Sequence, residues 1–382
     1  MAMPSKHWMI NMRIAILTFH RAYNCGAMLQ AWALKTVLER MGHSIEFPIL
    51  NHVGERTRWP STWVKWSANP LRLLRSFIYR SLYNFCSIPC EDIRRFRFKR
   101  FRKRYLPERA CTCEELAKYY DLIVIGSDQV WSDVHSLDEA PIFFAENLPA
   151  SIPKIGYAVS YGDKPLPTER LSRVVAAYQR FKAVSVREQL VQQQLEECGC
   201  GKPSVTLDPT LLLEKDDYRQ IITGARPLKE PYLFMYTLST QGFFVDTAKA
   251  IAKRLGVRAI IAPMYQRTRY GAVPGLTYGI SPDKLVEFVA HAKYVLAGSF
   301  HGTVLATIFG KPMLSLRMEA DNPDYPSRPG GLLKLVGQEK RLVTPDVSID
   351  DMIVRLTAPI PSTNKLLQAK ETSITWLKRN LE

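Results

Sequence analysis

The sequence lacks any long apolar run. None of its apolar stretches approaches the roughly 20 residues that a membrane-spanning helix needs. Its start, MAMPSKHWMINMRIAIL, also lacks the apolar core of a signal peptide, and we expect residues 1–11 to be either a disordered leader before the first strand or the product of an upstream start. With 46% apolar and 23% charged residues, the 382-residue chain has a globular composition, and its length predicts two domains. We therefore expect a cytoplasmic protein.

Paired cysteine motifs are missing as well. The chain has 7 cysteines, an odd number, at positions Cys25, Cys86, Cys90, Cys111, Cys113, Cys198 and Cys200. Their CxxxC and CxC spacings differ from the CxxC pairs that are typical of zinc sites. The sequence therefore predicts free thiols in a reducing compartment and no metal site.

Acidic residues are scarce in the first part of the chain only. Residues 1–110 contain 20 lysines and arginines against 6 acidic residues, which accounts for +14 of the total net charge of +16. Much of this charge lies in residues 55–110, which do not fit the strand and helix pattern found elsewhere. We interpret them as a basic helical insertion. No nucleic-acid-binding motif is present, so nucleic acid is not an expected partner, although a non-enzymatic nucleic-acid-binding protein remains open as an alternative.

Short apolar strands alternate with amphipathic helices in two blocks. The first block predicts strands at 13–18, 44–47, 121–125, 155–159 and 183–186, with helices at 27–41, 167–181 and 188–198. The second predicts strands at 232–238, 257–262 and 294–297, with helices at 243–255 and 282–292. Strands that are apolar throughout favour parallel sheets covered on both faces. We predict domains at 13–215 and 230–350, and a last helix within 364–382 that packs back on the first domain.

Four junctions after predicted strands are rich in polar residues. They read HRAYNCGAMLQAWAL (20–34), GSDQVW (126–131), SVREQ (185–189) and SFHG (299–302). Ligands of open α/β sheets bind at the carboxyl ends of the strands, so these junctions are candidate binding loops. The alternative for each is structural, because a loop histidine or an aspartate after a strand often only caps a helix.

Six stretches together resemble the polysaccharide pyruvyl transferase family across residues 13–345. They read AYNCGAMLQAWAL, YDLIVIGSDQVW, YAVSYG, VSVREQ, LDPTLLL and AGSFHGTVLATIFGKPM. The resemblance implies an α/β, GT-B-like fold with two Rossmann-like, doubly wound domains facing a cleft. It implies transfer of the carboxyethylidene unit of phosphoenolpyruvate to two hydroxyls of a sugar, with a cyclic ketal and phosphate as products. Two positions depart from the family pattern: Cys25 stands where a tyrosine is common, and Ser299 where some branches have an arginine.

The implied donor carries a carboxylate and a phosphate, and arginine forks suit both groups. The predicted donor-binding residues are Arg187, at a strand end of the first domain, and Ser299, Gly302, Thr303 and Arg328 of the second domain. The predicted acceptor-binding residues are His20, Asn24, Gly26, Gln129 and Trp131. His301 is the candidate acid that protonates the donor or its leaving phosphate, and Asp128 is a candidate base. Phosphoenolpyruvate would be a co-substrate, with no cofactor, and the acceptor would be a sugar or a lipid-linked oligosaccharide.

The basic segment 59–105 combines Trp59, Trp63 and Trp66 with the run IRRFRFKRFRKRY. Such a segment is typical of an element that lies on an anionic membrane surface, and a lipid-linked acceptor at the inner face would fit it. The alternative is a solvated face or a surface that holds an anionic substrate. A nucleotide-sugar glycosyltransferase also remains open, although Glu319 and Asp321 lack the spacing expected for a ribose contact.

Overall fold

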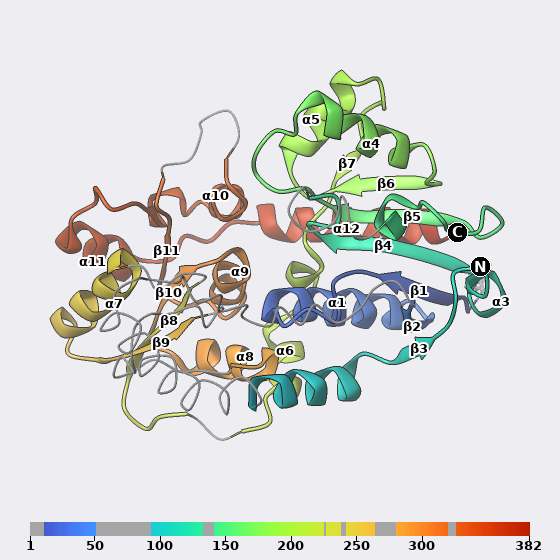
Figure 1. The fold of residues 1–382 in the computed structure, drawn as a ribbon. Coiled ribbons are helices and arrows are strands. Elements are labelled where there is room, and N and C mark those ends of the chain that lie inside the picture. Colours follow the sequence, from blue (N-terminus) through green and yellow to red (C-terminus); the bar gives the residue numbers. More distant parts are fainter. Residues whose placement is uncertain are drawn as a thin grey trace, which may run out of the picture.

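A computed structural model describes residues 11–50, 93–132, 141–224, 227–237, 242–263, 280–319 and 326–382. Two parallel sheets, each flanked by helices, lie side by side (Figure 1). The predicted α/β class with two Rossmann-like domains is therefore confirmed.

The first sheet has the strand order β3-β2-β1-β4-β5-β6-β7, and all its neighbouring strands are parallel. Its strands are β1 (Arg13–Leu17), β2 (Ser44–Ile49), β3 (Glu108–Ala110), β4 (Leu122–Asp128), β5 (Lys154–Val159), β6 (Ala183–Val186) and β7 (Ser204–Val205). Its helices are α1 (Cys25–Arg40), α3 (Leu116–Tyr119), η1 (Pro141–Phe144), α4 (Thr168–Tyr178) and α5 (Gln189–Glu197). The chain then passes through η2 (Pro209–Leu212) and α6 (Lys215–Ile221) to the second sheet.

The second sheet has the order β12-β11-β10-β8-β9, again all parallel. Its strands are β8 (Tyr232–Thr237), β9 (Arg258–Pro263), β10 (Tyr294–Gly298), β11 (Met313–Leu316) and β12 (Leu342–Val343). Its helices are α7 (Gly242–Arg254), α8 (Pro282–His291), α9 (Phe300–Ile308), α10 (Arg328–Leu335), η3 (Glu339–Arg341) and α11 (Ile349–Thr357).

The segment predicted as a helical insertion is only partly helical where it is described. Residues 93–105 form a helix, but residues Glu108–Ala110 form β3 and pair with β2, so that Glu108 lies beside Phe47. A strand of three residues is too short for its apolar pattern to be recognised. The same reason explains why β7 and β12, of two residues each, were not predicted; β11 was missed although it has four residues.

Helix α1 joins the two domains. Every residue from Cys25 to Leu34 is buried, because one side of the helix covers the first sheet and the other meets the second domain. The Trp32 ring lies 5.3 Å from that of Tyr218 in α6, and the thiol of Cys25 donates to the carbonyl of Ile280 just before α8. A continuous apolar cluster therefore runs from one domain into the other.

The last helix, α12 (Lys365–Leu381), returns to the first domain (Figure 1). Its Ser373 hydroxyl accepts a hydrogen bond of 3.0 Å from the Leu207 amide, and its Trp376 ring lies 5.9 Å from that of Tyr157 in β5. Leu377 is fully buried.

Residues Trp59, Trp63 and Trp66 lie outside the described residues, so the membrane-surface interpretation of 59–105 stays a prediction. Within the described ranges, no helix is long and apolar enough to cross a membrane. The described cysteines, Cys25, Cys111, Cys113, Cys198 and Cys200, are free thiols.

Candidate functional site

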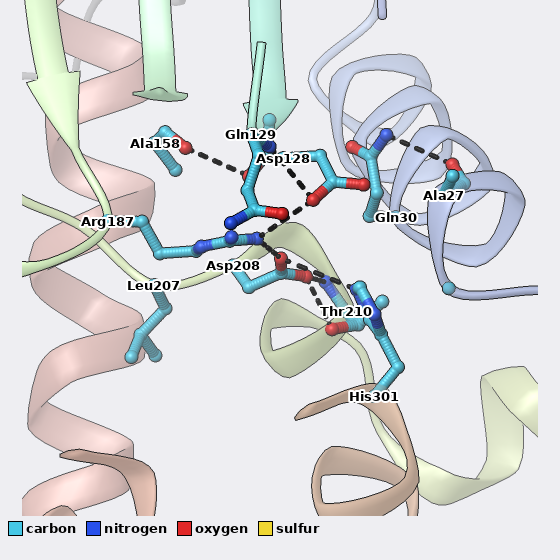
Figure 2. Close-up of polar contacts among 12 residues, drawn as sticks. Ala27, Gln30, Asp128, Gln129, Ala158, Arg187, Leu207, Asp208, Thr210 and His301 are labelled. Carbon is cyan, nitrogen blue, oxygen red and sulfur yellow. Dashed lines mark hydrogen bonds and ion pairs between the residues drawn. The ribbon is translucent and has the colours of Figure 1, made fainter. Parts of the chain in front are cut away.

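The strand order of each sheet reverses at one point. In the first sheet this point lies between β1 and β4, and in the second between β8 and β10. Loops diverge at such switch points, which makes them the usual ligand sites of open α/β sheets. Side chains that follow β4, β6 and β10 meet there, together with Asp208 from the loop before η2 (Figure 2).

Arg187 is the centre of this cluster. Its side chain is only 4% exposed, and its Nη1 donates to Asp208 at 2.8 Å and lies 3.7 Å from Asp128. Its Nε donates to Glu188 at 2.8 Å. Burial alone would lower the pKa of Arg187, but the three carboxylates outweigh it and raise that pKa above its ordinary value. Nη2 has no hydrogen-bond partner among the described residues.

Asp208 links Arg187 to His301. Its fully buried carboxylate accepts from the amide and hydroxyl of Thr210 at 3.0 and 2.5 Å, and one of its oxygens lies 3.7 Å from Nε2 of His301. Although burial raises the pKa of a carboxyl, contacts with His301, Arg187 and Thr210 hold the pKa of Asp208 well below its usual range. Asp208 is therefore an anion at neutral pH that faces the imidazole across the domain boundary.

The imidazole of His301 lies directly against Gly26, the second residue of α1. A Cβ added at Gly26 would lie 2.6 Å from Cγ of the ring and 2.7 Å from Cε1, too close for any side chain. Gly26 therefore allows a histidine of the second domain to approach the first turn of a helix of the first domain. Within the described structure, Nε2 of His301 has no hydrogen-bond partner, and the carboxylate of Asp208 faces it from 3.7 Å.

Arg328, the first residue of α10, completes the cluster. Its guanidinium carbon lies 5.9 Å from the centre of the Phe300 ring, and that of Arg187 lies 5.2 Å from the same ring. Burial and the nearby charge of Arg187 lower the pKa of Arg328. Its Nε is buried and has no partner in the described part of the chain. The unpaired Nη2 of Arg187 and Nε of Arg328, on guanidinium groups that lie near one aromatic ring, can donate hydrogen bonds to an anionic ligand.

Three other predicted residues shape the first turn of α9. Ser299 is its N-cap, and the Ser299 hydroxyl accepts from the Gly302 amide at 3.2 Å. A Cβ at Gly302 would lie 3.1 Å from that of Ala297, so this glycine lets α9 approach β10. The Thr303 hydroxyl is fully buried and bonds to the Ser299 carbonyl and the Ser315 hydroxyl. These three residues hold His301 in place.

The acceptor candidates are not all brought together. Asn24 caps α1 by accepting from the amides of Gly26 and Ala27. The side chain of Gln129 lies against Gly162. A Cβ added at Gly162 would be 2.6 Å from the side-chain amide nitrogen of Gln129. Trp131 is fully buried in the core of the first domain, and its indole donates to the Phe143 carbonyl.

His20 belongs to a separate buried cluster. Its Nε2 lies 3.3 Å from Glu108 in β3, and Arg102 lies 3.3 Å from the other oxygen of the same carboxylate. Burial raises the pKa of Glu108, but His20 and Arg102 hold it below the ordinary value. His20 follows β1 and Asp128 ends the neighbouring β4, but His20 pairs with Glu108 whereas Asp128 pairs with Arg187.

Asp128 ends β4 in a left-handed conformation, with φ of 79°. One of its oxygens accepts from the Gln129 amide at 2.9 Å and the same carboxylate faces Arg187. It thus makes the local turn contact expected of a capping residue and also lies in the cluster.

Sequence reasoning missed Asp208 and Glu188 as site residues. Both lie within stretches that carried the family resemblance, LDPTLLL and VSVREQ. Asp208 directly precedes Pro209, so its place in the sequence indicated a turn at a domain boundary, which concealed its contact with His301.

Acid catalysis on an anionic substrate can use a proton donor, a carboxylate that orients it and two arginines that bind the substrate. Nε2 of His301 makes no hydrogen bond within the described residues, Asp208 faces that nitrogen, and Arg187 and Arg328 lie beside them.

Comparisons with known proteins agree with this description. The family model described as polysaccharide pyruvyl transferase matches residues 24–318. Among solved structures, UDP-GlcNAc 2-epimerase of Methanocaldococcus jannaschii, in complex with UDP-GlcNAc and UDP, is similar with a TM-score of 0.55 and 11% identity, covering 96% of this chain and 100% of that one. The UDP-N-acetylglucosamine 2-epimerase of Rickettsia bellii gives 0.52 and 11%, covering 97% and 95%. At such identities the likeness shows the fold alone. Among curated protein sequences none matches significantly.

Proposed function

Because this chain belongs to the polysaccharide pyruvyl transferase family, we propose that it transfers the carboxyethylidene group of phosphoenolpyruvate to two hydroxyls of a sugar. The acceptor would belong to a cell-surface polysaccharide or to its lipid-linked precursor. The observation that carries the proposal is the buried contact of His301 with Asp208, beside the two arginines that flank Phe300.

The donor would place its anionic groups against Arg187 and Arg328. The Nη2 of Arg187 and the Nε of Arg328 are the guanidinium atoms that remain available within the described residues. Guanidinium groups bind carboxylate and phosphate strongly, and Nη2 of Arg187 would donate to the anion while Nε and Nη1 stay paired with Glu188 and Asp208.

The vinyl carbon of phosphoenolpyruvate takes up one proton and becomes a methyl group, while positive charge develops at the central carbon. The oxygen of one sugar hydroxyl forms a bond to that carbon, the bond from the carbon to the phosphate oxygen breaks, and the second hydroxyl closes the ketal. The two sugar hydroxyls lose two protons in total. One balances the proton that the vinyl carbon takes up, and the other leaves with the phosphate.

His301 would deliver the proton, and Asp208 would act as its positioning residue by stabilising the protonated ring. Asp128 would accept a proton from the acceptor hydroxyl. Glu188 is a second candidate for this base. Its Oε2 is buried and has no hydrogen-bond partner within the described ranges. Gln129 would contact the acceptor from the strand end that Asp128 occupies.

The test is stabilisation of the protein by candidate donors, followed by turnover. Ligands that bind the native state raise the melting temperature by mass action. Phosphoenolpyruvate should raise it more than pyruvate, which lacks the phosphate. Incubation with labelled phosphoenolpyruvate and glycan or lipid fractions of the native cell should then yield a ketal-linked, labelled product and phosphate. Stabilisation by UDP-sugars and not by phosphoenolpyruvate would instead support a nucleotide-sugar glycosyltransferase.

A further inference from the structure

Gln30 is a fully buried polar residue of α1 that lies beside the candidate site. It follows Gly26 by four residues, and residues four apart on a helix lie on the same face. Gly26 is the residue against which the imidazole of His301 packs. The side chain of Gln30 therefore starts from the face of α1 that meets His301, one helical turn further along.

The amide group of Gln30 is held in one orientation. Its Nε2 donates to the Ala27 carbonyl at 3.0 Å and to the Thr18 hydroxyl at 2.7 Å. Because a backbone carbonyl can only accept, the nitrogen and not the oxygen of the amide must face Ala27. The Thr18 hydroxyl donates in turn to the Ser127 carbonyl at 3.1 Å. This chain of hydrogen bonds connects Gln30 to the residue that precedes Asp128.

The oxygen of the same amide is left without a donor. Oε1 of Gln30 is buried and has no hydrogen-bond partner among the described residues. Figure 2 shows this oxygen on the side of Asp128, whereas the nitrogen points to Ala27. An amide oxygen can accept two hydrogen bonds, and leaving a buried one without any lowers stability. The fixed amide thus presents an acceptor beside the candidate base.

Ketal formation needs two hydroxyls of one sugar to be held close together. Asp128 is the candidate base for one of them, and its side chain is 11% exposed. A carboxylate can accept a hydrogen bond and then take up the proton, whereas an amide oxygen only accepts the hydrogen bond near neutral pH. Asp128 and Gln30 would therefore treat two neighbouring hydroxyls differently. The hydroxyl at Asp128 loses its proton and attacks first, and the hydroxyl at Gln30 is held until it closes the ring.

We propose that the side-chain carbonyl of Gln30 accepts a hydrogen bond from the second acceptor hydroxyl, and so selects sugars that present two hydroxyls side by side. This inference rests on the proposed function, because it assumes an acceptor that reacts through two hydroxyls. It assigns Gln30 to acceptor binding and leaves phosphoenolpyruvate to Arg187 and Arg328.

The experiment measures phosphate release at increasing concentrations of acceptor. The acceptor is polysaccharide of the native cell from which ketals have been removed with mild acid. Gln30→Met removes the carbonyl at nearly unchanged volume. The KM for the polysaccharide should rise about three- to tenfold, the contribution of one neutral hydrogen bond. The dissociation constant of phosphoenolpyruvate, measured by calorimetry, should stay within about twofold of the wild-type value.

Gln30→Glu is the conservative variant that should restore acceptor binding. Burial favours the neutral form of a carboxyl, whose hydroxyl can donate to the Ala27 carbonyl in place of Nε2. Its carbonyl oxygen then occupies the place of Oε1. We expect a KM for the polysaccharide within about twofold of the wild-type value. This variant also tests the proposal if Gln30→Met does not fold, which circular dichroism would show.

The matched control is Gln338→Met. Gln338 is buried and its Oε1 also lacks a partner in the part of the chain that the structure describes. It follows α10 at the end opposite to Arg328, away from the cluster around His301. Both the KM for the polysaccharide and the dissociation constant of phosphoenolpyruvate should stay at wild-type values.

Three outcomes overturn the role of Gln30 while pyruvyl transfer stands. The first is a wild-type KM for the polysaccharide in Gln30→Met, which would make the amide purely structural. The second is an equal rise of this KM and of the dissociation constant of phosphoenolpyruvate, which would indicate a general distortion. The third is a KM in Gln30→Glu as high as in Gln30→Met. If the wild type releases no phosphate with any polysaccharide or lipid fraction, the proposed function itself fails, and the role of Gln30 fails with it.

Discussion

The imidazole of His301 and the backbone of Gly26 are in direct contact although they come from different domains. A single methyl group at Gly26 would overlap the ring. The position of His301 relative to Asp208 and Arg187 therefore depends on how closely α9 approaches the start of α1.

Gly26→Ala tests this contact. The added methyl group should displace the imidazole, and a misplacement of about 1 Å lowers turnover by up to about 10²-fold. The protein should also lose about 1–3 kcal/mol of stability through overpacking. Phosphate release and urea denaturation measure the two effects. The control is Gly331→Ala in α10, where a Cβ meets no atom within 4 Å. Wild-type turnover in Gly26→Ala would show that the contact does not position the ring.

His301→Ala should lower turnover by about 10²–10⁴-fold, the usual contribution of a positioned acid. The affinity for phosphoenolpyruvate should change far less than turnover, and the melting temperature should stay close to that of the wild type. His301→Gln retains hydrogen bonding without acid chemistry and should be as slow. A folded variant with normal turnover would remove His301 from the mechanism.

Arg187→Lys keeps the charge and loses the planar fork. We expect the dissociation constant for phosphoenolpyruvate to rise by about 10- to 100-fold, the effect of losing a charged hydrogen bond. Titration calorimetry measures it. Arg173→Lys is the control, because the guanidinium of Arg173 also pairs with a carboxylate, that of Glu146, outside the cluster. Unchanged affinity in Arg187→Lys would argue against a bidentate donor contact.

Asp208→Asn should change how stability depends on pH. The pKa of Asp208 is depressed in the folded protein, so its carboxylate stabilises the fold above the unfolded value of about 3.9, and this contribution is lost as pH falls. The variant should be about 3–5 kcal/mol less stable at neutral pH, because a buried arginine loses a partner. Urea denaturation should show that the difference in unfolding free energy between the wild type and the variant becomes smaller below about pH 4.

The control for that experiment is Asp216→Asn on the exposed surface of α6, whose side chain is 72% exposed. It should leave stability nearly unchanged at every pH. A gap between wild type and Asp208→Asn that is constant from neutral pH to pH 3 would contradict the assigned charge of Asp208. The acid side of the pH–rate profile should shift in the same variant if Asp208 orients the protonated ring of His301.

Cys25 should resist alkylation in the native protein. Burial raises the pKa of its thiol to about 12, so the reactive thiolate is scarce near neutral pH. Cys198 is exposed and should react before Cys25. Peptide mapping after iodoacetamide treatment, in the absence and presence of denaturant, measures both. Labelling of Cys25 before unfolding would show that the start of α1 opens in solution.

The sequence alone predicted the sheets well, because parallel strands and their covering helices have periodic apolar patterns. The expected strand at 183–186 matches β6, and the helix expected at 243–255 matches α7 within one residue at each end. The sequence also singled out Arg187, because a charge directly after a buried strand is uncommon unless it has a partner or a ligand, and the structure places three carboxylates beside it.

Contacts between distant positions could not be predicted in the same way. Nothing local to Asp208 indicates that it faces His301, and nothing near His20 indicates that Glu108 approaches it from a strand within a basic segment. Trp131 shows the opposite difficulty. Its place beside Asp128 suggested a binding loop, yet its ring is buried in the core because the chain turns inward after β4.

The return of α12 to the first domain has a consequence for synthesis. Tyr157 and the amide of Leu207 receive their partners from Trp376 and Ser373, which leave the ribosome more than 150 residues later. The first domain therefore cannot complete its own surface while the second is being translated. A premature stop within residues 365–381 would therefore destabilise the first domain, although that domain is translated before the second. Folding of the chain during translation is complete only when α12 has packed on the first domain.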